Sequence, residues 1–142
     1  MKDTLKPGLK FEFDFKVPES KTVPYISPES EEFQIMPKVL STGFMVGLIE
    51  WACVRIVNEH IDWPSEQSVG IDIRLNHLAA TPPGLTVKVN GELTGVEGRK
   101  LSFAVSAHDG VDLITVGTHE RVVVNAEKFA AKAEEKAGQA GA

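Results

Sequence analysis

The N-terminal part of the chain shows a strict alternation of apolar and charged residues. Apolar side chains occupy every second position from residue 9 to residue 17, with charged residues between them: Leu9, Phe11, Phe13, Phe15 and Val17. A period of two places these side chains on one face of an extended chain, so the pattern predicts a first strand with one buried side.

Two helices are predicted next. The run Ser27-Pro28-Glu29 offers an N-cap, a proline at the first helical position and an early acid, which indicates a short helix from Pro28 to about Met36. Ser41 and Thr42 cap a longer helix to about His60, in which side chains recur at helical spacing: Phe44, Leu48, Trp51, Ala52, Arg55 and Ile56.

Four further strands are predicted by alternation, over residues 69–78, 85–93, 100–107 and 111–124. Pro82-Pro83-Gly84 and Asp109-Gly110 supply turns, the second of which is a strong hairpin signal. The tail from Asn125 is rich in Ala, Lys and Glu and predicts an exposed helix that frays toward Gly141. This order of elements indicates an α+β fold in which an antiparallel sheet wraps around a long central helix, as in the hotdog arrangement.

The size and composition restrict the class of protein. A chain of 142 residues and 15.4 kDa is expected to form a single domain over residues 1–142. The net charge of -5 and the pI near 5.4 argue against nucleic acid or an anionic membrane surface as a partner. The longest apolar stretch, residues 43–49, is too short to span a membrane, and residues 1–4 lack the hydrophobic region of a signal peptide, so a cytoplasmic protein is expected.

Neither a disulfide nor a metal site is predicted. Cys53 is the single cysteine, and a small buried core residue is a better interpretation of it than a nucleophile. His60, His108 and His119 stand apart from clustered acids, so no metal ligands are assigned. The open edges of the predicted sheet favour a homodimer, because pairing two copies would shield one edge of each.

Glu50 is the first candidate for chemistry. It is the only charged residue between Ser41 and Arg55, on a helix that is apolar nearly all round. A carboxylate in such surroundings needs either a partner or a task. A catalytic role and a structural hydrogen bond to a neighbouring strand or subunit are both open.

His77 and Thr42 are the second and third candidates. His77 continues the parity of the apolar residues from Val69 to Leu75 and is expected to face the long helix, either as a functional or as a structural histidine. Asp72 and His77 have the spacing of a hydratase pair, but their odd separation sends them to opposite faces of one strand, and the hydratase interpretation is rejected.

Thr42 stands at the N-terminus of the long helix, where free backbone N–H groups and the helix dipole favour negative charge. A plain N-cap is the alternative. In a continuous helix Glu50 would lie about 12 Å further along the axis. The two residues would then flank a substrate or meet across a dimer interface, unless the helix begins later.

Two further residues are candidates for binding. Gly70 can let a ligand carbonyl approach a backbone N–H, or it is an ordinary strand-entry glycine. Arg121 either meets the phosphates of a ligand or decorates the surface.

Several stretches together resemble one family, the fluoroacetyl-CoA thioesterase group of hotdog-fold thioesterases. The similarity covers nearly the whole chain and rests on residues 42–47, 50–55, His77 with 79–82, 96–99, 106–112 and 118–121. It implies a catalytic set of Thr42, Glu50 and His77, with Gly70 and Arg121 at ligand-binding positions. It also implies CoA as part of the substrate and no separate cofactor.

One departure from the family concerns the lid segment 33–37. Phe33 is kept, but Met36 stands where the fluoroacetyl-selective enzyme carries a gating phenylalanine. Because methionine shapes a pocket less rigidly than an aromatic ring, we expect a thioesterase without a strict fluorine requirement, acting on acetyl or another small acyl group. A non-catalytic acyl-CoA sensor and an enzyme that acts on carrier-protein thioesters are the alternatives.

Overall fold

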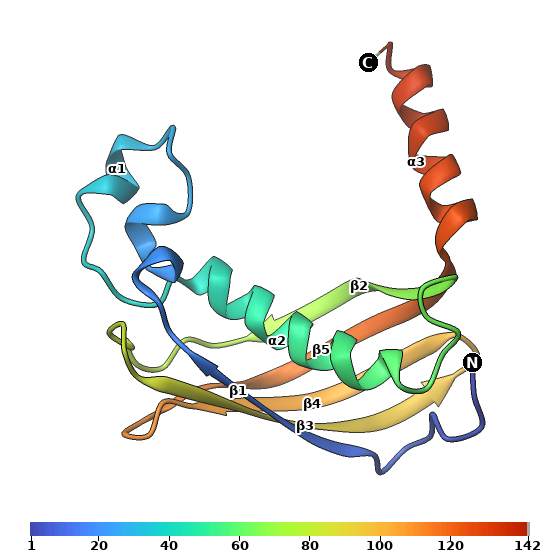
Figure 1. Ribbon diagram of the computed structural model, residues 1–142, viewed down its shortest axis with the longest axis horizontal. Coiled ribbons are helices and arrows are strands. Elements are labelled where there is room, and N and C mark those ends of the chain that lie inside the picture. The colour runs from blue at the N-terminus through green and yellow to red at the C-terminus, as the bar shows by residue number, and fades with distance from the viewer. Residues whose placement is uncertain (142) are drawn as a thin grey trace.

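The computed structural model describes residues 1–141 and consists of one antiparallel sheet curled around one long helix (Figure 1). The strands are β1 (Lys10–Lys16), β2 (Glu66–Leu75), β3 (Thr86–Glu97), β4 (Lys100–His108) and β5 (Leu113–Asn125). The helices are α1 (Glu31–Gln34), α2 (Thr42–Asn58) and α3 (Ala126–Gln139), with 3-10 turns η1 (Glu19–Lys21) and η2 (Val23–Tyr25) before α1.

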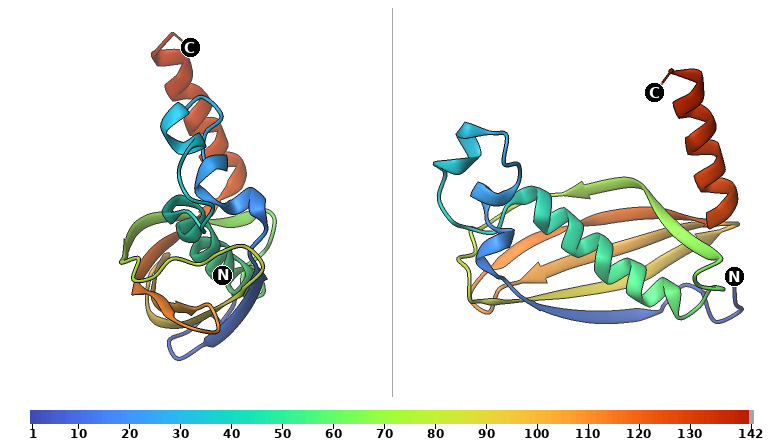
Figure 2. Two further views of the ribbon diagram at one scale, coloured as in Figure 1. Left: turned by 90° about the vertical axis from the view of Figure 1, so that its left-hand side faces the viewer. Right: turned by 45° about the horizontal axis from the view of Figure 1, so that its top comes forward.

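The sheet has the strand order β1-β3-β4-β5-β2, and every neighbouring pair is antiparallel. β1 and β2 are therefore the two edges, and α2 lies across the concave face between them (Figure 2). The predicted α+β arrangement of a sheet around a central helix is confirmed.

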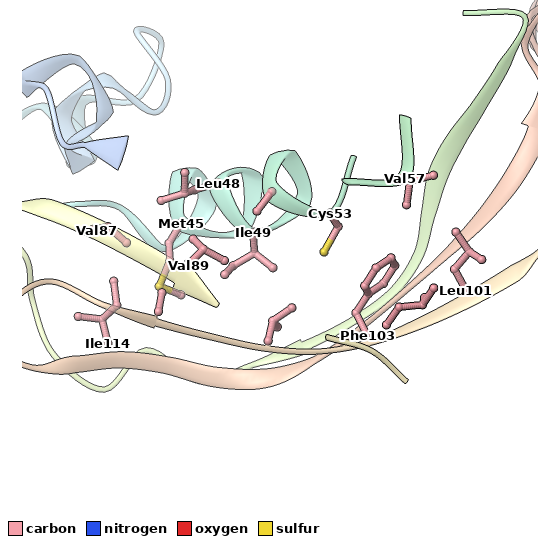
Figure 3. Packing of buried hydrophobic residues seen from close by; sticks show 14 of the residues in the cluster. Met45, Leu48, Ile49, Cys53, Val57, Val87, Val89, Leu101, Phe103 and Ile114 are labelled. Atoms are coloured by element: carbon pink, nitrogen blue, oxygen red, sulfur yellow. The ribbon is translucent and has the colours of Figure 1, made fainter. Parts of the chain in front are cut away.

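The core lies between α2 and the concave face of the sheet. The helix contributes a buried stripe at helical spacing, Met45, Ile49, Cys53 and Val57, which packs on side chains of β3, β4 and β5: Val87, Val89, Leu101, Phe103 and Ile114 (Figure 3). Full burial of one large apolar side chain stabilises the fold by about 1.5–3 kcal/mol. This packing fixes how far α2 can slide over the sheet, and thereby fixes the positions of Thr42 and Glu50.

The first helix is shorter than the sequence predicts. The helix predicted from Pro28 to Met36 is wrong at both ends, because α1 covers only Glu31–Gln34. The side chain of Ser30 accepts a hydrogen bond from the backbone N–H of Phe33 at 3.1 Å, so Ser30 is the N-cap instead of Ser27. Ser27 donates to the carboxylate of Glu29 at 2.6 Å in the preceding turn.

A β-bulge in β2 changes which side chains face the helix. The pairing with β5 shifts between Gly70 and Asp72, so Ile71 has no partner in the register and is 52% exposed. Ser68 is buried before the bulge, whereas Ile73 packs against the core after it. The prediction that one parity faces the helix throughout is therefore wrong for the part of β2 before the bulge.

Other boundaries differ by a few residues. β3 continues to Glu97, past its predicted end at residue 93, and Gly98 with φ of 63° forms the tight turn into β4. The predicted hairpin at Asp109-Gly110 is present between β4 and β5. The exposed C-terminal helix is confirmed as α3, which Asn125 caps by accepting from Lys128 N–H at 3.0 Å and which projects away from the sheet (Figure 1).

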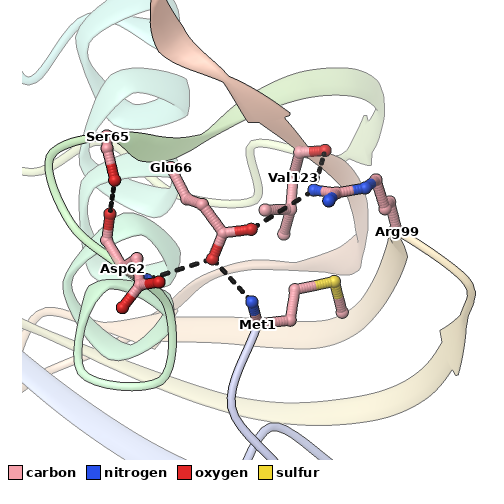
Figure 4. Close-up of polar contacts among 6 residues, drawn as sticks. All are labelled: Met1, Asp62, Ser65, Glu66, Arg99 and Val123. Carbon is pink, nitrogen blue, oxygen red and sulfur yellow. Dashed lines mark hydrogen bonds and ion pairs between the residues drawn. The ribbon is translucent and has the colours of Figure 1, made fainter.

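The N-terminus is tied to the far end of the sheet through Glu66 (Figure 4). Its carboxylate accepts from the ammonium of Met1 at 2.6 Å, from the Asp62 N–H at 3.1 Å and from the Arg99 guanidinium at 3.4 Å. The bond to the ammonium group is the main reason that the pKa of Glu66 is lowered to about 2. The same carboxylate thus joins the N-terminus, the loop after α2 and the β3–β4 turn.

No helix within residues 1–141 combines the length and the apolar character that a membrane span needs.

Candidate active site

The first polar cluster lies at the N-terminus of α2. Ser41 is the N-cap of this helix, because its backbone is extended and its hydroxyl accepts from the Phe44 N–H at 3.0 Å. Thr42 is the first helical residue, so the plain N-cap interpretation of Thr42 is wrong and its hydroxyl is left for another contact. That contact is Nδ1 of His77, at 2.9 Å from Oγ1 of Thr42.

His77 reaches Thr42 from the loop that follows β2. The strand ends at Leu75, two residues before His77, and the hydrogen bond to Thr42 shows that the ring lies at the N-terminus of the long helix, as predicted. The ring is half-buried, and this burial lowers the pKa of His77, so the imidazole is neutral at pH 7. Its Nε2 atom is buried and has no hydrogen-bond partner among residues 1–141. A neutral imidazole beside a hydroxyl can exchange a proton with it.

The second polar cluster surrounds Glu50 in the middle of α2. Oε1 of Glu50 accepts from Nη1 of Arg121 at 3.0 Å. The arginine side chain is 5% exposed and the glutamate side chain 42% exposed, so the ion pair has one buried and one accessible member. Glu50 therefore has on β5 the partner that its apolar setting requires, and part of its side chain remains accessible.

Arg121 is held in place by β2 as well as by Glu50. Its Nε donates to Oγ of Ser68 at 2.9 Å and its Nη2 donates to the Ser68 carbonyl at 2.8 Å. The interpretation of Arg121 as a surface arginine is wrong, whereas its role in binding CoA stays a prediction. The residue is buried at 4% exposure and its guanidinium points at Glu50.

Gly70 leaves room for the ion pair. It stands opposite Arg121 in the β2–β5 register. A Cβ atom at this position would lie 2.8 Å from Oε1 of Glu50 and 3.4 Å from Nη1 of Arg121. The group that approaches Gly70 closely within this chain is thus the Glu50 carboxylate, and the approach of a substrate carbonyl stays a prediction.

His119 is a member of this cluster that the sequence interpretation left out. Its Nε2 lies 3.0 Å from Nη1 of Arg121 and its Nδ1 lies 2.7 Å from the Asp72 carbonyl. The ring is 2% exposed. The sequence held a signal for it, because His119 shares the parity of Arg121 and Val123 and so falls on the buried face of β5.

The two clusters are separate within one chain. α2 runs without a break from Thr42 to Asn58, so the possibility that the helix begins after Thr42 is excluded. Glu50 follows Thr42 by eight positions, which corresponds to about 12 Å along the axis. The structure therefore brings together Thr42 with His77, and Glu50 with Gly70 and Arg121, as two groups.

Cys53 and possible metal ligands are the remaining chemical groups. Cys53 is fully buried, and burial raises the pKa of its thiol to about 12, which suits the predicted core residue and not a nucleophile. Within residues 1–141 no three His, Cys, Asp or Glu side chains are grouped so that they could hold a metal ion.

Comparison with known proteins identifies the family. Residues 18–127 match the family model described as fluoroacetyl-CoA-specific thioesterase. The chain is also 57% identical to the fluoroacetyl-CoA thioesterase of Streptantibioticus cattleyicolor over 136 residues, which is 96% of this chain and 97% of that protein.

The chain belongs to the fluoroacetyl-CoA-specific thioesterase family.

Solved structures agree with this assignment. The fluoroacetyl-CoA thioesterase FlK superposes with a TM-score of 0.91 at 56% identity, covering 94% of this chain and 98% of that one. A thioesterase superfamily member from Thermus thermophilus gives a TM-score of 0.80 at 26% identity, over 94% and 93% of the two chains. The family membership makes this protein a thioester hydrolase with the hotdog fold.

The segment 33–37, which the sequence predicts to be a lid, lies beyond the N-terminal end of α2 (Figure 1). Gln34 ties α1 to the preceding turn by donating to the Pro24 carbonyl at 3.1 Å. Phe33 is half-buried, Met36 is 44% exposed and Ile35 is 88% exposed. Solved structures of FlK include a phenylalanine-to-alanine variant bound to fluoroacetate and CoA.

Proposed function

We propose that this protein hydrolyses a small acyl-CoA thioester to the free acid and CoA, with Glu50, Thr42 and His77 as its catalytic residues in a single domain. The observation that carries the proposal is the state of Glu50. A carboxylate on an otherwise apolar helix is held at one oxygen by the buried Arg121, while 42% of its side chain stays exposed. A purely structural ion pair has no need of that exposure.

The chemistry follows from the two clusters. Glu50 either activates a water molecule, whose attack breaks the C–S bond and yields the acid and the CoA thiolate, or attacks the thioester carbonyl itself. In the second case CoA leaves as the thiolate and water then hydrolyses the acyl-enzyme anhydride to the free acid and Glu50. The Thr42 hydroxyl and the neutral His77 ring exchange a proton with the reacting groups. The free N–H groups at the start of α2 favour the negative charge that develops on the carbonyl oxygen. Trapping with hydroxylamine separates the two roles of Glu50, because only direct attack forms an acyl-enzyme anhydride.

A homodimer that combines the clusters is part of the proposal. Within one chain Thr42 and Glu50 are separated by about 12 Å of helix, which is too far for joint action on one carbonyl. β2 is an edge strand, and its bulged residue Ile71 is exposed beside Gly70. Pairing of two β2 edges would bury this residue and place the Glu50 cluster of one subunit near the Thr42 cluster of the other.

We propose small acyl groups as substrates, without a strict requirement for fluorine. The related protein of known activity is a fluoroacetyl-CoA thioesterase. Met36 in the lid has flexible torsions and is 44% exposed, so it limits the acyl group less tightly than an aromatic ring. Because CoA esters are metabolites of the cell interior, we propose a cytoplasmic location.

The first test is CoA release from acetyl-, fluoroacetyl-, propionyl- and phenylacetyl-CoA. We expect Glu50→Gln, which keeps an oxygen for Arg121 but loses the charge, to lower kcat by about 100-fold or more. Glu59→Gln, at the exposed C-terminal end of the same helix, is the matched control and should leave kcat unchanged. Tight binding of acyl-CoA without hydrolysis by the wild type would favour the sensor, and turnover only of acylated carrier protein would replace CoA as the carrier.

The second test addresses the shared site. Glu50→Gln and Thr42→Val subunits are co-expressed with different affinity tags, and the mixed dimers are purified through both tags. If each site takes Glu50 from one subunit and Thr42 from the other, one of the two sites in a mixed dimer is intact and about half of the wild-type kcat returns. Inactive mixed dimers would show that each site lies within one chain.

A further inference from the structure

A buried histidine stands behind the ion pair of Glu50 and is not part of the proposed catalytic set. His119 on β5 is 2% exposed. It precedes Arg121 by two residues, so both side chains lie on the same face of the strand. Its ring is enclosed by Phe103 of β4, which stacks on it at 6.3 Å between centroids. A buried imidazole is costly unless both nitrogens are satisfied, so its hydrogen bonds indicate what the ring does.

The hydrogen bonds of His119 determine its tautomer. Arg121 is always charged and only donates, so Nε2 of His119 is the acceptor in their 3.0 Å contact. The Asp72 carbonyl only accepts, so Nδ1 carries the proton in the 2.7 Å contact. Both contacts are satisfied by one form, the neutral imidazole with its proton on Nδ1.

The neutral form is supported by the surroundings of the ring. The charged groups that face it are Arg121 on β5, Glu50 on α2 and Asp72 on β2, and β4 contributes the apolar Phe103. Burial, followed by the nearby Arg121, lowers the pKa of His119, and this outweighs the opposing effects of Asp72 and Glu50.

The arrangement divides the hydrogens of one guanidinium nitrogen between two acceptors. Nη1 of Arg121 donates to Oε1 of Glu50 and to Nε2 of His119, each at 3.0 Å. The remaining partners of the guanidinium are the hydroxyl and the carbonyl of Ser68, which are neutral. Glu50 is therefore the only anionic group bound to Arg121 among the described residues, and His119 fixes the direction of Nη1 without competing for its charge.

We propose that His119 is a positioning residue for the thioesterase reaction: it holds Nη1 of Arg121 so that Glu50 is bound through Oε1 and presents its other oxygen to the substrate. The β-bulge of β2 takes part, because it interrupts the ladder beside Asp72, whose carbonyl receives the ring N–H. Gly70 leaves the space in which the three side chains meet, with a Cβ there only 3.3 Å from Cε1 of His119. This inference rests on the proposed role of Glu50.

Two substitutions separate positioning from simple packing. His119→Phe keeps the ring volume and the stacking on Phe103 but removes the acceptor for Arg121. His119→Gln is long enough to bring a carbonyl oxygen to the place of Nε2 and restores that acceptor. His60→Gln is the matched control, because His60 is bonded to Thr4 at the far end of α2.

We expect kcat to fall only in the variant that lacks a hydrogen-bond acceptor for Arg121. We expect His119→Phe to lower kcat at least 30-fold with KM within threefold of wild type, His119→Gln to retain kcat within fivefold, and His60→Gln to match wild type. Equal kcat for the Phe and Gln variants would overturn the inference, as would losses that track the melting temperature. Full kcat of His119→Phe would overturn it while leaving the thioesterase proposal intact, whereas a wild type inactive on every acyl-CoA would overturn both.

A measurement that keeps His119 in place tests the inference even if His119→Phe does not fold. Nitrogen-15 NMR of the His119 ring should show the neutral Nδ1–H tautomer at pH 6.5, where an ordinary histidine is half protonated. Arg121→Lys should shift the Nε2 resonance, since the donor is displaced. A protonated ring at pH 6.5, or a proton on Nε2, would overturn the inference.

Discussion

Gly70 leaves open the space that the carboxylate of Glu50 needs, since a methyl group at this position would lie 2.8 Å from Oε1. The obstructed atom is the end of a flexible side chain, so the chain can fold around an added methyl group by turning Glu50 away from Arg121. The cost then falls on the reaction more than on the fold.

Gly70→Ala should lower kcat by about 10-fold or more while the free energy of unfolding changes by about 1 kcal/mol or less. The measurements are CoA release and urea denaturation on the same samples. Gly117→Ala on the facing strand β5 is the contrasting variant, because its Cβ would lie 1.8 Å from the Arg74 backbone carbonyl. That variant should lose several kcal/mol of stability, and a Gly70→Ala enzyme with wild-type kcat would show that the position of Glu50 is unimportant.

Ser41 and Thr42 allow capping to be separated from chemistry. Ser41→Ala removes the N-cap of α2 and should lower stability by about 1 kcal/mol with little change in kcat. Thr42→Val keeps the shape of the side chain but removes the hydroxyl that contacts His77, so kcat should fall about 100-fold at nearly unchanged stability. Thr42→Ser should keep most of the activity because the hydroxyl remains. The reverse outcome, with Ser41→Ala inactive and Thr42→Val active, would remove Thr42 from the catalytic set.

The order and type of the main elements were predictable from the chain. The alternation from Leu9 to Val17 and the apolar spacing along α2 each match an element of the structure. The bulge at Ile71 was not predictable, because it arises from the long-range pairing of β2 with β5 and no local turn signal marks it. The bulge alone reverses the parity on which a face assignment along β2 depends.

The sequence indicated which residues form the site better than it indicated which side chains they contact. Glu50 and His77 stood out because polar groups at apolar positions are rare, and both take part in side-chain hydrogen bonds. The burial of Arg121 could not be predicted, since the residue that binds its side chain, Ser68, lies 53 positions away in the chain. Long-range partners of this kind cannot be read from the spacing of residues along one strand.

Met36 offers a test of acyl selectivity. Met36→Phe places an aromatic ring in the lid where the methionine is 44% exposed. If Met36 covers the acyl group, as we propose, the ratio of kcat/KM for fluoroacetyl-CoA to that for acetyl-CoA should rise about 10-fold or more, because a rigid ring leaves less space than a flexible methionine. Met36→Leu, similar in volume but not aromatic, should leave the ratio near the wild-type value. A ratio that is already high in wild type and unchanged in Met36→Phe would mean that selectivity lies elsewhere.

The contacts of Glu66 lead us to expect that the stability of the fold depends on pH and on the N-terminal ammonium group. Because its pKa is lowered to about 2 in the folded state, its contribution is fully present above pH 4.5, the ordinary range of a glutamate, and is lost as the pH falls toward 2. Glu66→Gln should therefore unfold more easily than wild type by about 1 kcal/mol at pH 7, with the difference shrinking between pH 4.5 and 2.

Residues added before Met1 should have a similar effect at neutral pH, because they remove the ammonium group that lies 2.6 Å from Glu66. The same residues added after the exposed helix α3 are the control and should leave the melting temperature unchanged. In the Glu66→Gln background the N-terminal extension should cost little more, since both changes break the same contact. Additive losses in the double variant would show that the ammonium and the carboxylate stabilise the fold independently.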